Sequence, residues 1–120
     1  MKRQKAERGG RRAERLAAWW LRLKGWRILD RRVRTPVGEV DLIVRRGKVT
    51  VFVEVKQRSF SRQEGDALAA VNRRRILRAA QYWLIRHPDL ANEGLRFDVI
   101  FLAPFAWPRH LKNAFDGTGL

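Results

Sequence analysis

Three residues in the middle of the chain have the types and the spacing that metal-assisted phosphate chemistry requires. Asp41 is followed thirteen residues later by Glu54, and Lys56 stands two residues beyond Glu54. Carboxylate oxygens are the ligands that Mg²⁺ and Mn²⁺ prefer. An ammonium group beside them can polarise a water molecule or stabilise the charge that develops on a phosphate. The sequence therefore predicts that Asp41 and Glu54 hold Mg²⁺ or Mn²⁺, and that Lys56 assists the hydrolysis of a phosphodiester.

A β-hairpin formed by residues 39–45 and 48–56 is expected to position these side chains. In the second segment, valines occupy every second position, and this pattern predicts a buried face. Glu54 and Lys56 then lie together on the opposite face. The turn between the two segments is expected at residues 46–47.

The register of this hairpin decides which side chains meet. A loop centred on residues 46–47 pairs residues whose numbers sum to 93, so that Asp41 faces Phe52 and Glu39 faces Glu54. Three carboxylates clustered on an apolar strand pair repel one another, and a divalent cation would remove that cost. The alternative is a solvated hairpin face whose acids pair with arginines of neighbouring elements.

The remaining segments predict an α/β fold with a small mixed sheet flanked by helices. Outside the hairpin, apolar spacing predicts helices over residues 11–24 and 66–86 and strands over residues 26–34 and 95–102. The expected order is helix, three-strand meander, helix and strand. Residues 1–120 provide enough chain for a single domain. We expect residues 1–9 to be frayed and residues 104–120 to form an irregular tail.

The charge of the chain favours a polyanionic partner. Lys and Arg number 27 against 12 Asp and Glu, which gives a net charge of +15. Such an excess favours binding of nucleic acid through phosphate contacts. Candidate contacts are the arginines after the hairpin and in the second predicted helix, namely Arg58, Arg73, Arg74, Arg75 and Arg78. A solvated helix face and a solubilising surface are the ordinary alternatives.

Composition also excludes several kinds of site. The chain contains no cysteine, which excludes disulfides, thiolate catalysis and cysteine-ligated zinc. Only two histidines, His87 and His110, are present, so that a histidine-rich metal site is not expected. The N-terminal segment lacks the apolar core of a signal peptide, and no apolar run is long enough to cross a bilayer. We therefore expect a cytoplasmic protein with no membrane partner.

Two segments of the hairpin carry a resemblance to a known family. GEVDLIV, which contains Asp41, and VFVEVKQR, which contains Glu54 and Lys56, resemble the PD-(D/E)XK nuclease core. The chain is most similar to the YraN-type uncharacterised bacterial family (UPF0102-like), which is related to archaeal Holliday-junction resolvases. The similarity runs from about Gly10 to Ala103 and includes the segments RRAERLAAWWL, NRRRILRAAQYWL and RFDVIFL.

The resemblance implies a restriction-endonuclease-like fold and a role for each acid. Asp41 and Glu54 correspond to the metal-binding acids, and Lys56 corresponds to the catalytic lysine. Glu14 corresponds to a helix glutamate that reaches the same site, although its sequence context alone indicates an ordinary surface residue. Glu39 occupies a position at which related proteins often carry an additional acid.

Three functions remain open at this point. The leading hypothesis is a metal-dependent endonuclease acting on DNA, with branched or damaged DNA as a candidate substrate. The alternatives are a nucleic-acid-binding protein that keeps the nuclease fold without turnover, and an RNA-associated accessory protein. Of the five tryptophans, Trp19 and Trp107 are hardest to place in a core, and they could stack on bases or form the contact of a homodimer.

Overall fold

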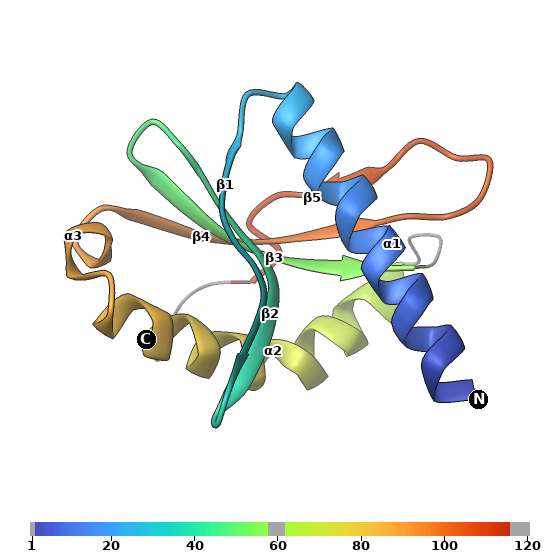
Figure 1. Ribbon diagram of the computed structural model, residues 1–120, viewed down its shortest axis with the longest axis horizontal. Coiled ribbons are helices and arrows are strands. Elements are labelled where there is room, and N and C mark those ends of the chain that lie inside the picture. The colour runs from blue at the N-terminus through green and yellow to red at the C-terminus, as the bar shows by residue number, and fades with distance from the viewer. Residues whose placement is uncertain (1, 58–61, 116–120) are drawn as a thin grey trace.

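The computed structural model describes residues 2–57 and 62–115, and the side chains of residues 10–57 and 73–115. Eight elements follow one another along the chain (Figure 1). They are α1 (Lys2–Leu23), β1 (Arg27–Thr35), β2 (Gly38–Arg46), β3 (Val49–Lys56), α2 (Arg62–Ile85), α3 (Pro88–Ala91), β4 (Gly94–Phe101) and β5 (Arg109–Leu111).

The five strands form one mixed sheet in the order β1-β2-β3-β4-β5. The strand pairs β1–β2, β2–β3 and β4–β5 are antiparallel, whereas β3 and β4 are parallel. A parallel pair needs a long crossover connection, and α2 supplies it. The predicted α/β fold, a small mixed sheet flanked by helices, is therefore confirmed, and it is compatible with a small nuclease-like core.

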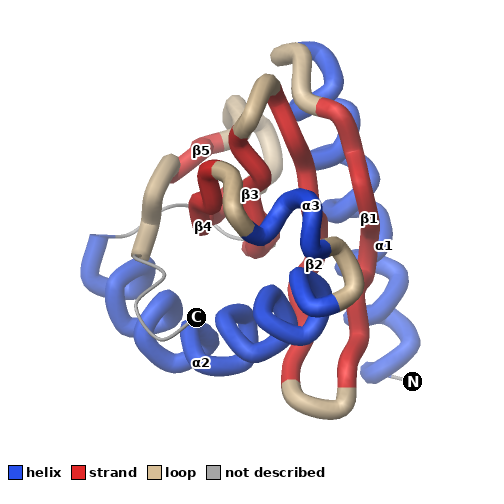
Figure 2. The backbone as a smooth tube through the Cα atoms, turned by 90° about the vertical axis from the view of Figure 1, so that its left-hand side faces the viewer, coloured by secondary structure: helices blue, strands red, loops and turns tan. Residues whose placement is uncertain are grey.

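Helices α1 and α2 lie on opposite sides of the central strands (Figure 2). Val51 and Val53 pack against the α1 side of the sheet, as the alternation of valines predicts. The opposite face of β3 is also buried, because Phe52 packs beneath α2 with its ring at right angles to that of Trp83. β3 is thus covered on both faces, and any charged side chain that it carries must be held in an apolar setting.

Both ends of the chain differ from the sequence-based expectation. Residues 1–9 were expected to be frayed, but α1 begins at Lys2. Residues 104–120 were expected to be irregular, but β5 (Arg109–Leu111) lies within them and adds an antiparallel strand beside β4. A three-residue strand carries too short an alternation to be recognised from the sequence.

The predicted register of the β2–β3 hairpin was wrong by two residues. Ile43, and not Asp41, lies opposite Phe52, and the pairing continues through Leu42 and Val53. The turn is formed by residues 47–48, and its first residue is a glycine with φ of +61°. A shift of two residues preserves the face on which each paired residue lies, so the alternation predicted for residues 42–46 and 49–53 is unchanged.

A close approach of α2 fixes the start of β2. A β-carbon at Gly38 would lie 1.9 Å from the backbone oxygen of Arg75. Only a residue without a side chain fits there, and the contact sets how tightly the helix packs on the strand that carries Asp41.

Candidate active site

Asp41 lies where the hydrogen-bonded pairing of β2 with β3 ends. The pairing runs from Arg46 and Val49 to Leu42 and Val53, and one further step in the same register places Asp41 beside Glu54. The Val55 backbone N–H donates a hydrogen bond to Asp41 Oδ2 at 2.8 Å. The carboxylate therefore accepts a backbone donor of β3 and is held against that strand.

An irregularity in the neighbouring strands accompanies this position. Val40 packs on the α2 side of the sheet and Leu42 on the α1 side, whereas a regular strand would place both on one face. The register of β1 places Arg32 opposite Asp41, and Arg32 has a φ of +52°. Local departures from regular pairing re-aim side chains and are frequent beside active sites.

The Glu54 side chain is in direct contact with Asp41 and close to Lys56. It is 17% exposed, and its Oε1 lies 3.6 Å from Lys56 Nζ, which is 15% exposed. Burial, followed by the negative charge of Asp41 and a hydrogen bond to it, raises the pKa of Glu54 to about 8, although Lys56 opposes the shift. Among the described side chains, Lys56 supplies the ammonium group beside these two carboxyl groups, and ionising both is costly.

Glu14 approaches the same pair from α1. The residue is 6% exposed, and its Oε2 lies 3.7 Å from Arg32 Nε. Burial and then the charge of Asp41 raise the pKa of Glu14, against the arginines of β1. Glu14 is thus not the ordinary surface residue that its sequence context indicates, and its charge interacts with that of Asp41.

These acids offer two carboxylates in contact, with a third, Glu14, whose charge interacts with that of Asp41. In the part of the chain whose side chains are described, no three acidic or histidine side chains are grouped closely enough to hold a metal ion unaided. Mg²⁺ is commonly bound by one or two carboxylates together with water and substrate phosphates. The Asp41–Glu54 pair fits that requirement in its chemistry.

Glu39 does not belong to this group of acids. Its carboxylate lies 3.3 Å from Arg34 Nη1 and 3.7 Å from Arg75 Nη2. For this acid the alternative drawn from the sequence holds, since it pairs with arginines of neighbouring elements. We therefore leave Glu39 out of the proposed metal ligands.

The predicted phosphate contacts are only partly covered by the structure. Arg74, Arg75 and Arg78 are exposed on α2, and Arg73 is partly buried. Arg58 lies outside the described residues. The sequence reasoning missed Arg32, although it stands in the run DRRVR directly beside the strand that carries Asp41.

A second buried carboxylate lies on β4. Asp98 is 1% exposed and accepts two hydrogen bonds from Arg96, at 2.9 Å each, and one from the backbone N–H of Asn113 at 2.9 Å. His110 Nε2 lies 2.7 Å from the same carboxylate. Burial alone would raise the pKa of Asp98, but the hydrogen bonds from His110, Arg96 and Asn113 outweigh it and lower that pKa. Arg96 and Asp98 therefore form an ion pair within β4.

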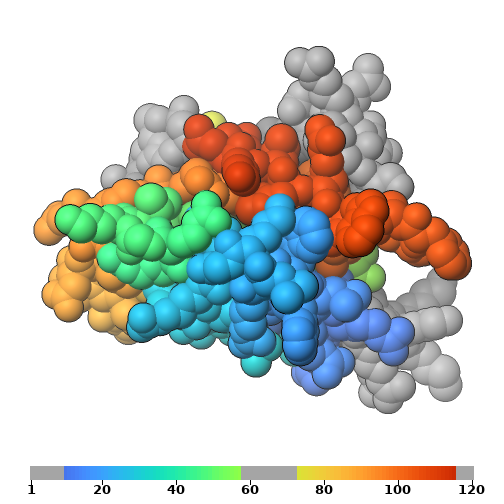
Figure 3. Space-filling model, turned by 90° about the horizontal axis from the view of Figure 1, so that it is seen from above, coloured from blue at the N-terminus to red at the C-terminus, as the bar shows by residue number. Residues whose placement is uncertain are grey.

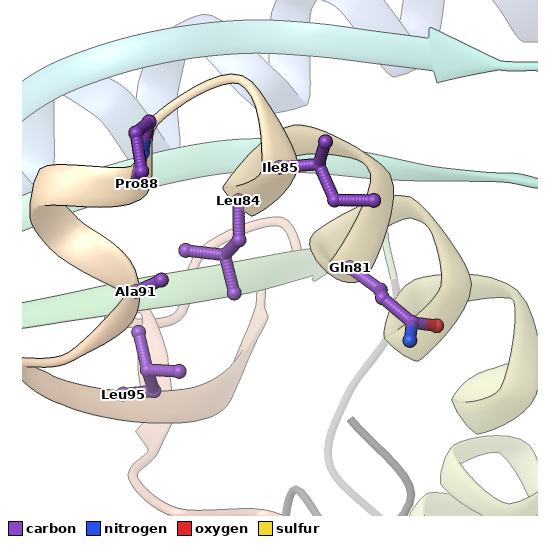
Figure 4. Close-up of a pocket in the computed structure, with 6 residues that line it drawn as sticks. All are labelled: Gln81, Leu84, Ile85, Pro88, Ala91 and Leu95. Atoms are coloured by element: carbon purple, nitrogen blue, oxygen red, sulfur yellow. The ribbon is translucent and has the colours of Figure 1, made fainter.

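A pocket of about 510 Å³ lies apart from these acids, between the end of α2, helix α3 and the start of β4 (Figure 4). Its lining consists of Gln81, Leu84, Ile85, Pro88, Ala91 and Leu95, and includes no titratable side chain. Without an acid, a base or a nucleophile in its walls, this pocket offers no group for hydrolysis.

Comparison with known proteins places the chain in a family. The sequence model described as "Uncharacterised protein family UPF0102" matches residues 13–102. The chain belongs to this family. The matched range includes Glu14, Asp41, Glu54 and Lys56.

Bacterial UPF0102 proteins match almost the whole chain. The chain is 50% identical to one from Mesorhizobium japonicum over 115 residues, which cover 96% of this chain and 92% of that protein. It is 47% identical to one from Bartonella tribocorum over 113 residues, with 94% and 87% covered. A UPF0102 protein of Methylorubrum extorquens is 50% identical over 119 residues, with 98% and 93% covered. The names of these relatives state the family and no activity.

Among residues 2–57 and 62–115, no helix combines the length and the apolar character needed to cross a membrane.

Proposed function

We propose that this protein is a metal-dependent endonuclease that hydrolyses phosphodiester bonds in DNA. The observation that carries the proposal is the contact between the Asp41 and Glu54 carboxyl groups at the end of the β2–β3 pairing, with Lys56 Nζ 3.6 Å from Glu54. The resemblance of the surrounding segments to the PD-(D/E)XK core supports the same function. A preference for branched or damaged DNA follows from the resemblance to resolvases alone.

The charge of the protein makes the acid pair informative. A protein with a net charge of +15 that only bound nucleic acid would gain nothing from two buried carboxyl groups held side by side. A divalent cation, Mg²⁺ or Mn²⁺, would remove their repulsion and would be held by Asp41 and Glu54, with Glu14 of α1 as a third ligand. When bound, such a cation supplies positive charge to a phosphate oxygen and makes a water molecule more acidic.

The side chains of the protein then have distinct roles. Asp41 is fixed through Oδ2 by the Val55 N–H, which holds its carboxyl group beside that of Glu54. Lys56 is positioned to orient the attacking water or to stabilise the negative charge that develops on the phosphate. Arg74 and Arg78, exposed on α2, can hold flanking phosphates, because a guanidinium pairs with a phosphate through two hydrogen bonds.

One observation favours the second candidate, a nucleic-acid-binding protein without turnover. With its pKa raised to about 8, Glu54 is mostly protonated at neutral pH and hydrogen-bonded to Asp41, so that the pair is tolerated without a cation. With either function, we expect the protein to bind nucleic acid in the cytoplasm. An RNA-associated role is a further proposal that rests on the same surface charge. A homodimer that cuts two strands is a further proposal that rests on analogy with junction-cutting nucleases.

Cleavage assays decide between these candidates. The purified protein is incubated with Mg²⁺ or Mn²⁺ and single-stranded, duplex, flap, four-way-junction and RNA substrates. We expect cleavage by the parent and none by Glu54→Ala or Lys56→Ala, which should retain salt-dependent binding. Glu39→Ala is the matched control, because it removes a carboxylate of β2, the strand that carries Asp41, that lies outside the pair, and it should cut like the parent.

Two outcomes would contradict the enzyme assignment. Binding without cleavage under either metal would favour the non-catalytic alternative. Cleavage that persists in both site variants would mean that another site, or a contaminant, performs the reaction.

A further inference from the structure

The outward face of α1 carries large apolar side chains that the fold leaves exposed. Leu16, Trp19 and Leu23 are 56%, 63% and 76% exposed. They stand three and four residues apart, and this spacing aligns them along one side of a helix. The opposite side of α1 supplies the core contacts through Ala17 and Leu21. The exposed row is therefore a second apolar face and not part of the core.

A row of arginines borders this face. Arg15 precedes Trp19 by four residues and Arg22 follows it by three, so that both lie one helical turn from the indole, and both are exposed. The only acid among residues 10–23 is Glu14, which is buried on the inner side. The outward face of the described part of α1 therefore combines a flat aromatic ring with uncompensated positive charge.

The loop between β4 and β5 extends this surface. Trp107 is 85% exposed and Phe105 is fully exposed, and Phe105 has a φ of +58°, a conformation that side chains other than glycine rarely adopt. The Trp107 ring lies 6.4 Å from that of Trp20, which follows Trp19 in the chain. In two views the loop runs beside α1 and projects from the body of the protein (Figures 1 and 3).

We infer that this surface, made of Leu16, Trp19 and Leu23 on α1 with Phe105 and Trp107 on the loop, binds unpaired nucleotides by base stacking, while Arg15 and Arg22 contact their phosphates. The inference rests on the proposed function only in taking nucleic acid as the partner, and it requires no hydrolysis. Exposed rings stack on bases of any sequence, and a neighbouring row of cations follows the phosphate backbone. A protein with this surface holds single-stranded segments, such as those at flaps and junctions, beside the sheet that carries the acid pair.

The charge and the rings of this surface distinguish a nucleic acid from two other candidate occupants. A second copy of the chain would bring the same positively charged face, with no exposed acid in residues 10–23, against itself. A lipid surface offers phosphates to Arg15 and Arg22 but no flat rings to stack on Trp19, and the vesicle measurement below tests it. A nucleic acid strand offers flat bases and phosphates together, and it matches both the rings and the cations.

Oligonucleotide binding in the presence of a chelator tests the inference, because it needs no metal and no cleavage. Fluorescence anisotropy compares a labelled thymidine strand of about 20 nucleotides, the matching uridine strand and a duplex of equal length. We expect Trp19→Ala with Trp107→Ala to weaken binding of the single strands by about 10-fold or more and to leave duplex binding within about 2-fold. Because both indoles are largely exposed, the variant should keep the melting temperature of the parent.

Two further variants make the test specific. Trp19→Phe keeps a flat ring and should retain most of the single-strand affinity. Ile85→Ala, which removes a side chain that is 73% exposed on α2, should bind all strands like the parent. Arg15→Gln with Arg22→Gln should reduce the salt dependence of single-strand binding.

The results that would overturn the inference are distinct from failure of the nuclease. Equal single-strand affinity in the parent and in the double tryptophan variant would remove the stacking role, even if the acid pair cleaves DNA. If the parent bound anionic vesicles and the double tryptophan variant did not, the surface would be a membrane-binding one. If the parent sedimented as a dimer and the variant did not, the surface would be an interface between two copies of the chain. A thymidine strand bound much more tightly than a uridine strand would name DNA as the partner, and the reverse would name RNA.

Discussion

Two buried acidic centres lie in the same sheet, one around Asp98 on β4 and the other around Asp41 and Glu54 on β2 and β3. Asp98 receives hydrogen bonds from Arg96 and a backbone N–H, contacts His110, and has a lowered pKa. Glu54 faces another carboxyl group and one ammonium group, and its pKa is raised to about 8. Asp98 is 1% exposed and the Glu54 side chain is 17% exposed, and the partners of the two acids are of opposite kinds.

The comparison separates an acid whose charge the surrounding donors stabilise from one whose charge the surrounding groups oppose. The donors around Asp98 outweigh the cost of burying its charge, as expected for a carboxylate that stabilises a fold. The donors around Glu54 do not, and such an arrangement is kept where a cation or a substrate completes it. An acid whose pKa is raised by its neighbours, as that of Glu54 is, is the better guide to function.

The largest effect is expected from removing the compensated acid. Asp98→Ala should lower the free energy of unfolding by about 3–5 kcal/mol, because Arg96 and the Asn113 N–H lose their buried acceptor. Urea denaturation measures this loss. The matched control is Asp89→Ala, an exposed acid of α3, for which a change below about 0.5 kcal/mol is expected. A small effect at Asp98 would erase the difference between the two centres.

Replacing Glu54 is expected to change the free energy of unfolding in the opposite direction, toward greater stability. Its pKa is about 8 in the folded protein and near 4.5 when unperturbed, so that the folded state binds more protons between these values and loses stability as the pH rises through them. Glu54→Gln cannot ionise and should be more stable than the parent by about 1–3 kcal/mol near pH 9, with little difference near pH 5. Thermal melting in chelator across this range measures the difference. A parent that gains stability with rising pH would contradict the assignment.

The smallest effect is expected from the cation itself. Mg²⁺ or Mn²⁺ well above its dissociation constant should stabilise the parent by about 1–3 kcal/mol, and more strongly at alkaline pH, where Glu54 gives up its proton readily. Melting curves with and without metal measure the shift. An equal metal-induced shift of the melting temperature in Glu54→Gln would place metal binding elsewhere.

The sequence predicted the fold class and the identity of the paired acids because alternation fixes faces and chain order fixes neighbours. It could not predict the register. The position of the turn at residues 47–48 depends on local backbone energies, and shifting the strand pairing by two residues leaves the alternation of faces unchanged. Nor could it distinguish Glu14, buried and coupled to Asp41, from Glu39, paired with Arg34 and Arg75. Both are acids flanked by arginines, and only tertiary packing gives them different surroundings.

The hydrogen bond from Val55 N–H to Asp41 Oδ2 links the assembly of the hairpin to the assembly of the proposed site. A hairpin that forms in the wrong register loses this bond and separates Asp41 from Glu54 at the same time. For a protein proposed to cut DNA, this coupling would confine cutting to correctly folded copies.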